Sequence, residues 1–86
     1  MTRSEIFDVV KANVQNVIEG AQGKEITESN SMRDYGADSL EIVEVVSRSM
    51  KQLRLKVPRT VLSSARNLGD LVTLFQEADA KVTTVV

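Results

Sequence analysis

The feature that most constrains the fold is the spacing of the apolar residues, which recur every three or four positions in three separate segments. In residues 3–19 the steps are four, four and three. This period puts the side chains on one face of a helix, and we predict a helix there. Thr2 and Glu5 have the spacing of a capping box, and Gly20 is a natural end. The residues of this stripe are Ile6, Val10, Val14 and Val17.

A second helix is predicted from residue 39 to about residue 53 or 55. Its apolar residues follow at steps of three, three, four and three, which predicts one inward face. Asp38 and Glu41 have capping-box spacing at its start, and Pro58 ends any continuation, because the ring removes a hydrogen-bond donor. The predicted inward residues are Leu40, Val43, Val46, Met50 and Leu53.

The last third of the chain predicts a short helical turn in residues 59–65 and a final helix from Asn67, its cap, to about Ala78. We expect residues 79–86 to be a disordered tail. The fold class is therefore all-α: one domain over residues 1–86, a four-helix bundle with three main helices, one short helix and a long first loop. The inward residues of the last helix are Leu68, Leu71, Val72 and Phe75.

The long first loop covers residues 20–38, where the helical period disappears. Loops of this length inside a compact domain are uncommon and are usually functional or fixed by buried side chains. We expect Ile26, Met32 and Tyr35 to fix this one.

Charge and residue types exclude several classes of function. The net charge of −1 and the 3% of aromatic residues argue against nucleic-acid binding. No apolar run is long enough to span a membrane and no signal peptide opens the chain, so we expect a cytoplasmic monomer. The chain has neither His nor Cys. It therefore cannot assemble a Ser–His or Cys–His nucleophile, and we predict no metal site and no enzymatic activity.

The segment 33–41 is the one place where chemistry is expected. It brings the Ser39 hydroxyl to the first turn of a helix, directly after a loop that contains Gly36. Unpaired backbone N–H groups and the helix dipole favour a phosphate at such a position. The alternative is that Ser39 only helps to cap the helix beside Asp38.

The residues Gly36-Ala37-Asp38-Ser39-Leu40, preceded by Asp34-Tyr35, resemble the signature of the acyl carrier protein family. The similarity extends over roughly residues 6–78 and implies an acyl-carrier-like four-helix bundle. It implies that a separate Mg-dependent phosphopantetheinyl transferase attaches 4′-phosphopantetheine from coenzyme A to Ser39. The terminal thiol of this arm then carries acyl groups as thioesters. The resemblance also implies that the transferase recognises Asp38.

The charge of the second helix differs from that of typical fatty-acid carriers, in which this helix is strongly acidic. Residues 39–59 hold two acidic and five basic residues, whereas residues 1–38 hold seven acidic and four basic ones. Basic residues near the end of a helix either complement its dipole or form a docking surface for a partner. The candidate partner-binding residues are Asp38, Leu40, Glu41, Glu44, Arg48 and Lys51.

Residues 50–59 and 65–71 are similar to free-standing donor carriers of polyketide β-branching cassettes. The acceptor carriers of these cassettes bear a Trp in the second helix, and this chain has none. The resemblance implies a malonyl cargo that is decarboxylated to acetyl. The implied partners are an acyltransferase, a decarboxylating ketosynthase-like protein and an HMG-type synthase. A general polyketide or fatty-acid carrier, or an unmodified helical interaction module, remains as an alternative.

Overall fold

The computed structural model describes the backbone of residues 1–84 and the side chains of residues 1–79. Within this part the chain is all-helical, as the sequence predicted. The main helices are α1 (Arg3–Val17), α2 (Ser39–Leu53) and α4 (Leu68–Thr84), and α3 (Arg59–Leu62) is short. Two short 3₁₀ helices, η1 (Glu19–Ala21) and η2 (Met32–Tyr35), lie in the first loop and were not predicted.

Local capping signals set the starts of the main helices. Thr2 caps α1 and forms the predicted capping box with Glu5. The side chain of Asn67 accepts a hydrogen bond from the Asp70 N–H at 2.8 Å, which confirms it as the cap of α4. Each of these side chains satisfies an N–H group that the helix itself leaves without a partner. The starts of helices were therefore readable from the sequence.

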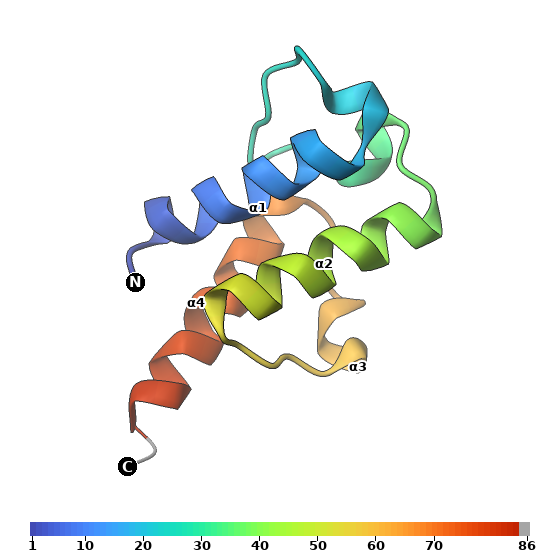
Figure 1. Ribbon diagram of the computed structural model, residues 1–86. Coiled ribbons are helices and arrows are strands. Elements are labelled where there is room, and N and C mark those ends of the chain that lie inside the picture. Colours follow the sequence, from blue (N-terminus) through green and yellow to red (C-terminus); the bar gives the residue numbers. More distant parts are fainter. Residues whose placement is uncertain (85–86) are drawn as a thin grey trace.

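The core lies where α1 packs against both α2 and α4, as Figure 1 shows. It is aliphatic except for Phe75 and Tyr35, in agreement with the low aromatic content. All four predicted inward residues of α4 are buried. A polar side chain joins α1 to α2. The Asn13 amide of α1 donates to the Ser49 hydroxyl of α2 at 3.1 Å and to the Gln52 side chain at 2.8 Å.

The first loop is fixed as predicted, because Ile26, Met32 and Tyr35 are all buried. The Tyr35 hydroxyl accepts a hydrogen bond from the Thr27 N–H at 3.3 Å and donates one to the Glu25 carbonyl at 3.0 Å. The loop also binds the start of α4. The carbonyls of Asn30 and Glu28 accept from the N–H groups of Leu68 and Gly69, each at 2.9 Å.

A single arginine joins three parts of the chain. The Arg3 guanidinium of α1 donates to the Glu28 carboxylate of the loop at 2.6 Å, and to the Gly69 carbonyl at 3.0 Å and the Thr73 hydroxyl at 2.8 Å in α4. These charge-assisted bonds hold the loop against the two helices. The first loop, which leads into α2, is thereby anchored at Glu28.

The predicted inward face of α2 was right for Leu53, which is buried, and for Val46 and Met50, which pack half-buried against the core, but it was wrong for Leu40 and Val43. The buried residues of this helix are Val45, Ser49 and Leu53, whereas Leu40 is 82% and Val43 48% exposed. The Asn13–Ser49 hydrogen bond explains the difference, because it turns a polar residue of α2 inward at the contact with α1.

Two helix ends also differ from the prediction. α1 ends at Val17, two residues before the predicted Glu19, and η1 follows it. α4 runs to Thr84 and not to about Ala78, so residues 79–84 of the predicted tail are helical. The last two residues of that tail, 85–86, lie outside the described residues.

Candidate functional site

Ser39 is the first residue of α2, and its side chain is exposed. The residue before it fixes this position. The Asp38 carboxylate accepts from the Glu41 N–H at 2.8 Å, and the Glu41 carboxylate accepts from the Asp38 N–H at 3.0 Å. This is the predicted capping box. The capping box binds the N–H of Glu41. The N–H groups that come earlier in the first turn, beside the Ser39 hydroxyl, have no partner within the helix and can bind an anion.

The turn before α2 depends on Gly36, which closes η2 with a φ of 87°. A residue with a side chain would be strained in this left-handed conformation. A Cβ atom added to Gly36 would meet nothing within 4 Å, so the space beside the turn is open. Ala37 follows and is buried, with its N–H bonded to the Met32 carbonyl at 3.3 Å. The loop therefore fixes the backbone while leaving room around Ser39.

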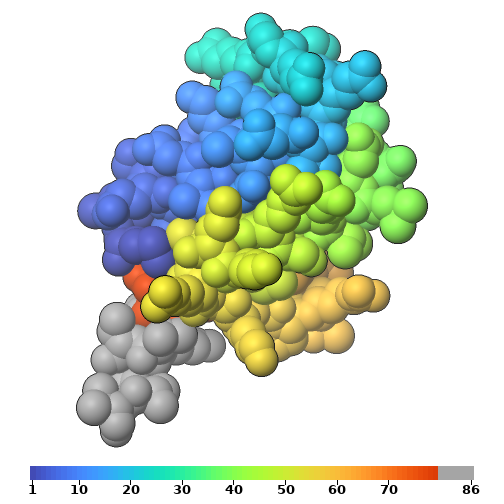
Figure 2. Space-filling view, viewed as in Figure 1, coloured from blue at the N-terminus to red at the C-terminus, as the bar shows by residue number. Residues whose placement is uncertain are grey.

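The surface view agrees with this placement. In Figure 2 the green segment that contains the start of α2 lies at the edge of the molecule. A phosphate ester on Ser39 would lie in solvent at a helix N-terminus, where the dipole and the free N–H groups favour negative charge. The residues present therefore fit a phosphodiester-linked group.

The other predicted partner-binding residues lie along α2. Leu40 and Val43 form an apolar surface next to Ser39, and Glu44 is exposed. Glu44 and Arg48 form an ion pair at 3.3 Å, four residues apart. The exposed Lys51 lies in the last turn of the helix. The structure thus gathers Asp38, Leu40 and Glu41 around Ser39 and spreads the three charged residues along the helix.

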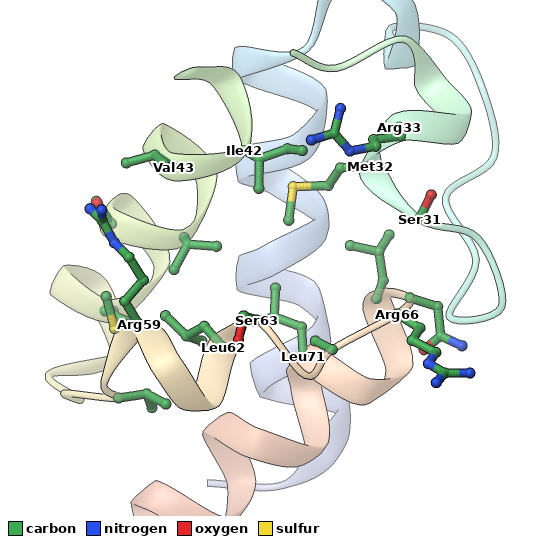
Figure 3. A pocket seen from close by; sticks show the side chains of 17 residues that line it. Ser31, Met32, Arg33, Ile42, Val43, Arg59, Leu62, Ser63, Arg66 and Leu71 are labelled. Carbon is green, nitrogen blue, oxygen red and sulfur yellow. The ribbon is translucent and has the colours of Figure 1, made fainter. Parts of the chain in front are cut away.

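Sequence reasoning missed a cavity of about 500 Å³ between α2, α3, η2 and the start of α4. Its body is apolar, and three arginines, Arg33, Arg59 and Arg66, also line it, as Figure 3 shows. No period in the sequence could reveal it, because its walls come from four separate segments. The apolar lining residues include Met32, Ile42, Val46, Met50, Leu62 and Leu71.

Within the described residues, no helix is long and apolar enough to cross a membrane. In the same part of the chain, no group of three or more Asp and Glu side chains could hold a metal ion.

Comparison with known proteins gives consistent matches. Residues 9–75 match the family model described as "Phosphopantetheine attachment site". The polyketide biosynthesis acyl-carrier-protein AcpK of Bacillus subtilis is 29% identical over 77 residues, which cover 90% of this chain and 94% of that protein. An acyl carrier protein of Saccharopolyspora erythraea is 29% identical over 85 residues, 98% of this chain and 88% of its own length.

A solved structure shares the fold. It is the crystal structure of the curacin biosynthetic pathway HMG synthase in complex with acetyl donor-ACP. The matching chain has a TM-score of 0.78 and 25% sequence identity, over 87% of this chain and 96% of that one.

Proposed function

The chain belongs to the phosphopantetheine attachment-site family and is an acyl carrier protein, and from this premise we propose that Ser39 carries the arm and that the cargo is a small acyl unit for polyketide β-branching. When bound, 4′-phosphopantetheine supplies a thiol that holds an acyl group as a thioester. The chain itself displays the serine and presents a surface to partner enzymes, which perform the catalysis.

The observation that carries the assignment is the exposed Ser39 hydroxyl at the start of α2. Several other serines are engaged or buried, and the exposed Ser4 and Ser47 do not follow an open glycine turn. Ser49 is fully buried, and the hydroxyls of Ser63 and Ser64 donate to backbone carbonyls at 2.8 and 2.7 Å. The Ser31 hydroxyl accepts the Asp34 N–H at 3.3 Å. Ser39 is exposed, follows an open turn and lies at the N-terminus of a long helix, where the dipole favours negative charge.

The donor role rests on the comparisons. AcpK is named as a polyketide carrier, and the solved structure holds a donor carrier together with an HMG synthase. The absence of Trp also agrees with a donor. We therefore propose a malonyl or acetyl cargo. The proposed partners are a phosphopantetheinyl transferase, an acyltransferase, a decarboxylating ketosynthase-like protein and an HMG-type synthase, all met in the cytoplasm by a monomeric carrier.

The proposed docking surface is the exposed side of α2 that follows Ser39. Leu40 supplies its apolar contact and Glu44, Arg48 and Lys51 its charges. Arg48 already pairs with Glu44 on the surface, so Lys51 is the less compensated of the two basic residues. Charge reversal at both basic residues should slow turnover by one partner without affecting attachment of the arm.

Attachment is tested by intact-mass analysis after incubation with coenzyme A and a broad-specificity transferase. The wild-type chain should gain one phosphopantetheine, and Ser39→Ala should gain none. Ser47→Ala is the matched control, because Ser47 is exposed on the same helix two turns further on, and it should be modified like the wild type. A wild-type chain that stays unmodified would remove the proposal.

The donor role is tested separately with the modified protein. Acetyl-loaded protein should transfer its acyl unit to an HMG-type synthase. If it loads but serves only chain-extending ketosynthases, the alternative of a general polyketide or fatty-acid carrier is correct.

A further inference from the structure

The cavity described above combines an apolar body with cations that have no counter-charge. None of its lining residues is acidic, whereas Arg33, Arg59 and Arg66 all contribute to it. The ion pairs of the described residues involve Arg3, Arg48 and the N-terminus, but none of these three guanidinium groups. In a protein with a net charge of −1, this is a local basic site beside an apolar surface. Such a site is complementary to a ligand with an apolar body and an anionic end.

The three arginines are not equivalent. In Figure 3 the Arg33 guanidinium lies beside Ile42, and the Arg59 side chain rises from α3 along the side of α2 below Val43. The Arg66 side chain points away on the opposite side. Arg33 therefore lies at the part of the cavity where α2 and η2 meet, and Arg59 and Arg66, which lie on other sides of it, serve as comparisons of equal charge.

This part of the cavity is close to Ser39 along the chain. Ile42 and Val43, which line it, lie one helical turn beyond Ser39, and Arg33 belongs to η2, directly before the turn that leads to α2. A volume of about 500 Å³ is in the range of small-molecule sites, and it suits a tethered acyl unit better than a segment of a partner protein.

We infer that Arg33 binds the free carboxylate of an acyl cargo, so that the cavity selects cargo that ends in a carboxylate, such as malonyl. This inference rests on the proposed function. Guanidinium groups suit carboxylates because their N–H donors match the two oxygens. The phosphodiester of the arm is a less suitable ligand, because it is fixed at Ser39, on the exposed start of α2.

The inference has a consequence for the order of events. Loss of CO₂ from a malonyl thioester, with uptake of one proton at the α-carbon, leaves a neutral acetyl thioester. The ligand of Arg33 then disappears. The malonyl form is held in the cavity and the acetyl form is released to the next enzyme.

The test compares three forms of the same protein, made with a transferase from coenzyme A, acetyl-coenzyme A and malonyl-coenzyme A. NMR records the arginine Nε–H signals and the methyl signals of Ile42 and Val46. We expect the malonyl form alone to shift the signal of Arg33, and we expect it to shift the methyl signals more than the acetyl form does. Arg33→Gln should lower the bound fraction of the malonyl arm about 2- to 5-fold, whereas Arg59→Gln and Arg66→Gln should leave it unchanged.

Each other outcome has a defined meaning. Equal shifts in the malonyl and acetyl forms would overturn the inference, and so would equal effects of all three substitutions. Arginine shifts already present without cargo would assign the site to the phosphodiester and overturn the carboxylate assignment. Failure of attachment at Ser39 would instead remove the proposed function. All three arginines are exposed, and circular dichroism of each variant checks that the fold is kept.

Discussion

Replacement of Asp38 separates two roles that coincide in the wild-type chain. Its carboxylate caps α2 by accepting the Glu41 N–H at 2.8 Å, and its charge lies next to the serine that we propose is modified. The substitution Asp38→Asn would keep an acceptor oxygen at the same position without the charge, because Asn and Asp are equally good caps. The substitution Asp38→Ala would remove both the acceptor and the charge. Together the two variants therefore distinguish a cap from a recognition charge.

The expected change in stability follows from the cap geometry. Loss of an N-cap costs about 1 kcal/mol, so Asp38→Ala should lower the Tm by about 4–8 °C in a domain of this size. With a urea m-value of about 1–2 kcal/mol/M, the urea midpoint should fall by about 0.5–1 M. Asp38→Asn should stay within about 0.5 kcal/mol of the wild type. Equal destabilisation by both substitutions would refute the assignment of stability to the cap.

The initial rate of phosphopantetheine attachment gives the second readout, measured well below the Tm of every variant. We expect both substitutions to slow attachment about tenfold, because both remove the charge that the transferase reads. If Asp38→Asn is modified at the wild-type rate while Asp38→Ala is slow, the transferase requires only the start of a well-formed helix. The recognition role of the charge would then be wrong.

Three further predictions concern the scaffold. Gly20→Ala would bring its Cβ against the Tyr35 carbonyl oxygen, so thermal unfolding should show a loss of about 1–3 kcal/mol, and an unchanged Tm would contradict this packing. Asn13→Ala removes the amide that joins α1 to the Ser49 hydroxyl, and urea unfolding should show a loss of about 2 kcal/mol. The capping-box hydrogen bond from the Thr2 N–H lowers the pKa of Glu5 below its ordinary 4.5. Stability from this group is therefore complete above pH 4.5 and is lost as the pH falls through the lower folded-state pKa, and Glu5→Gln should flatten that part of the pH profile.

Much of the fold could be predicted because its signals are local. A capping box needs two residues three positions apart, and those at Thr2 and Asp38 were visible in the sequence. The buried anchors of the first loop stood out as isolated apolar residues in a polar segment. The cavity could not be predicted, because its lining residues, such as Arg33, Arg59 and Ile42, surround one space only when η2, α3 and α2 have packed together.

The exposure of Leu40 and Val43, at the start of the predicted inward face of α2, shows where two predictions from one pattern conflict. At about 100° per residue, Ser39 lies within about 40° of Val43, Val46 and Met50 around the helix axis. If this whole side of the helix were enclosed up to its first turn, Ser39 would be enclosed with it, and no transferase could reach its hydroxyl.

The observed face centres on Val45 and Ser49, about 80° or more from Ser39 around that axis. A polar residue, Ser49, takes a fully buried position and bonds to Asn13, while Leu40 stays in solvent. Burial of a leucine is worth about 1.5–3 kcal/mol, so this arrangement forgoes stability. What the chain gains is an exposed Ser39 with an apolar surface beside it, which is what a carrier that must be modified and then recognised requires.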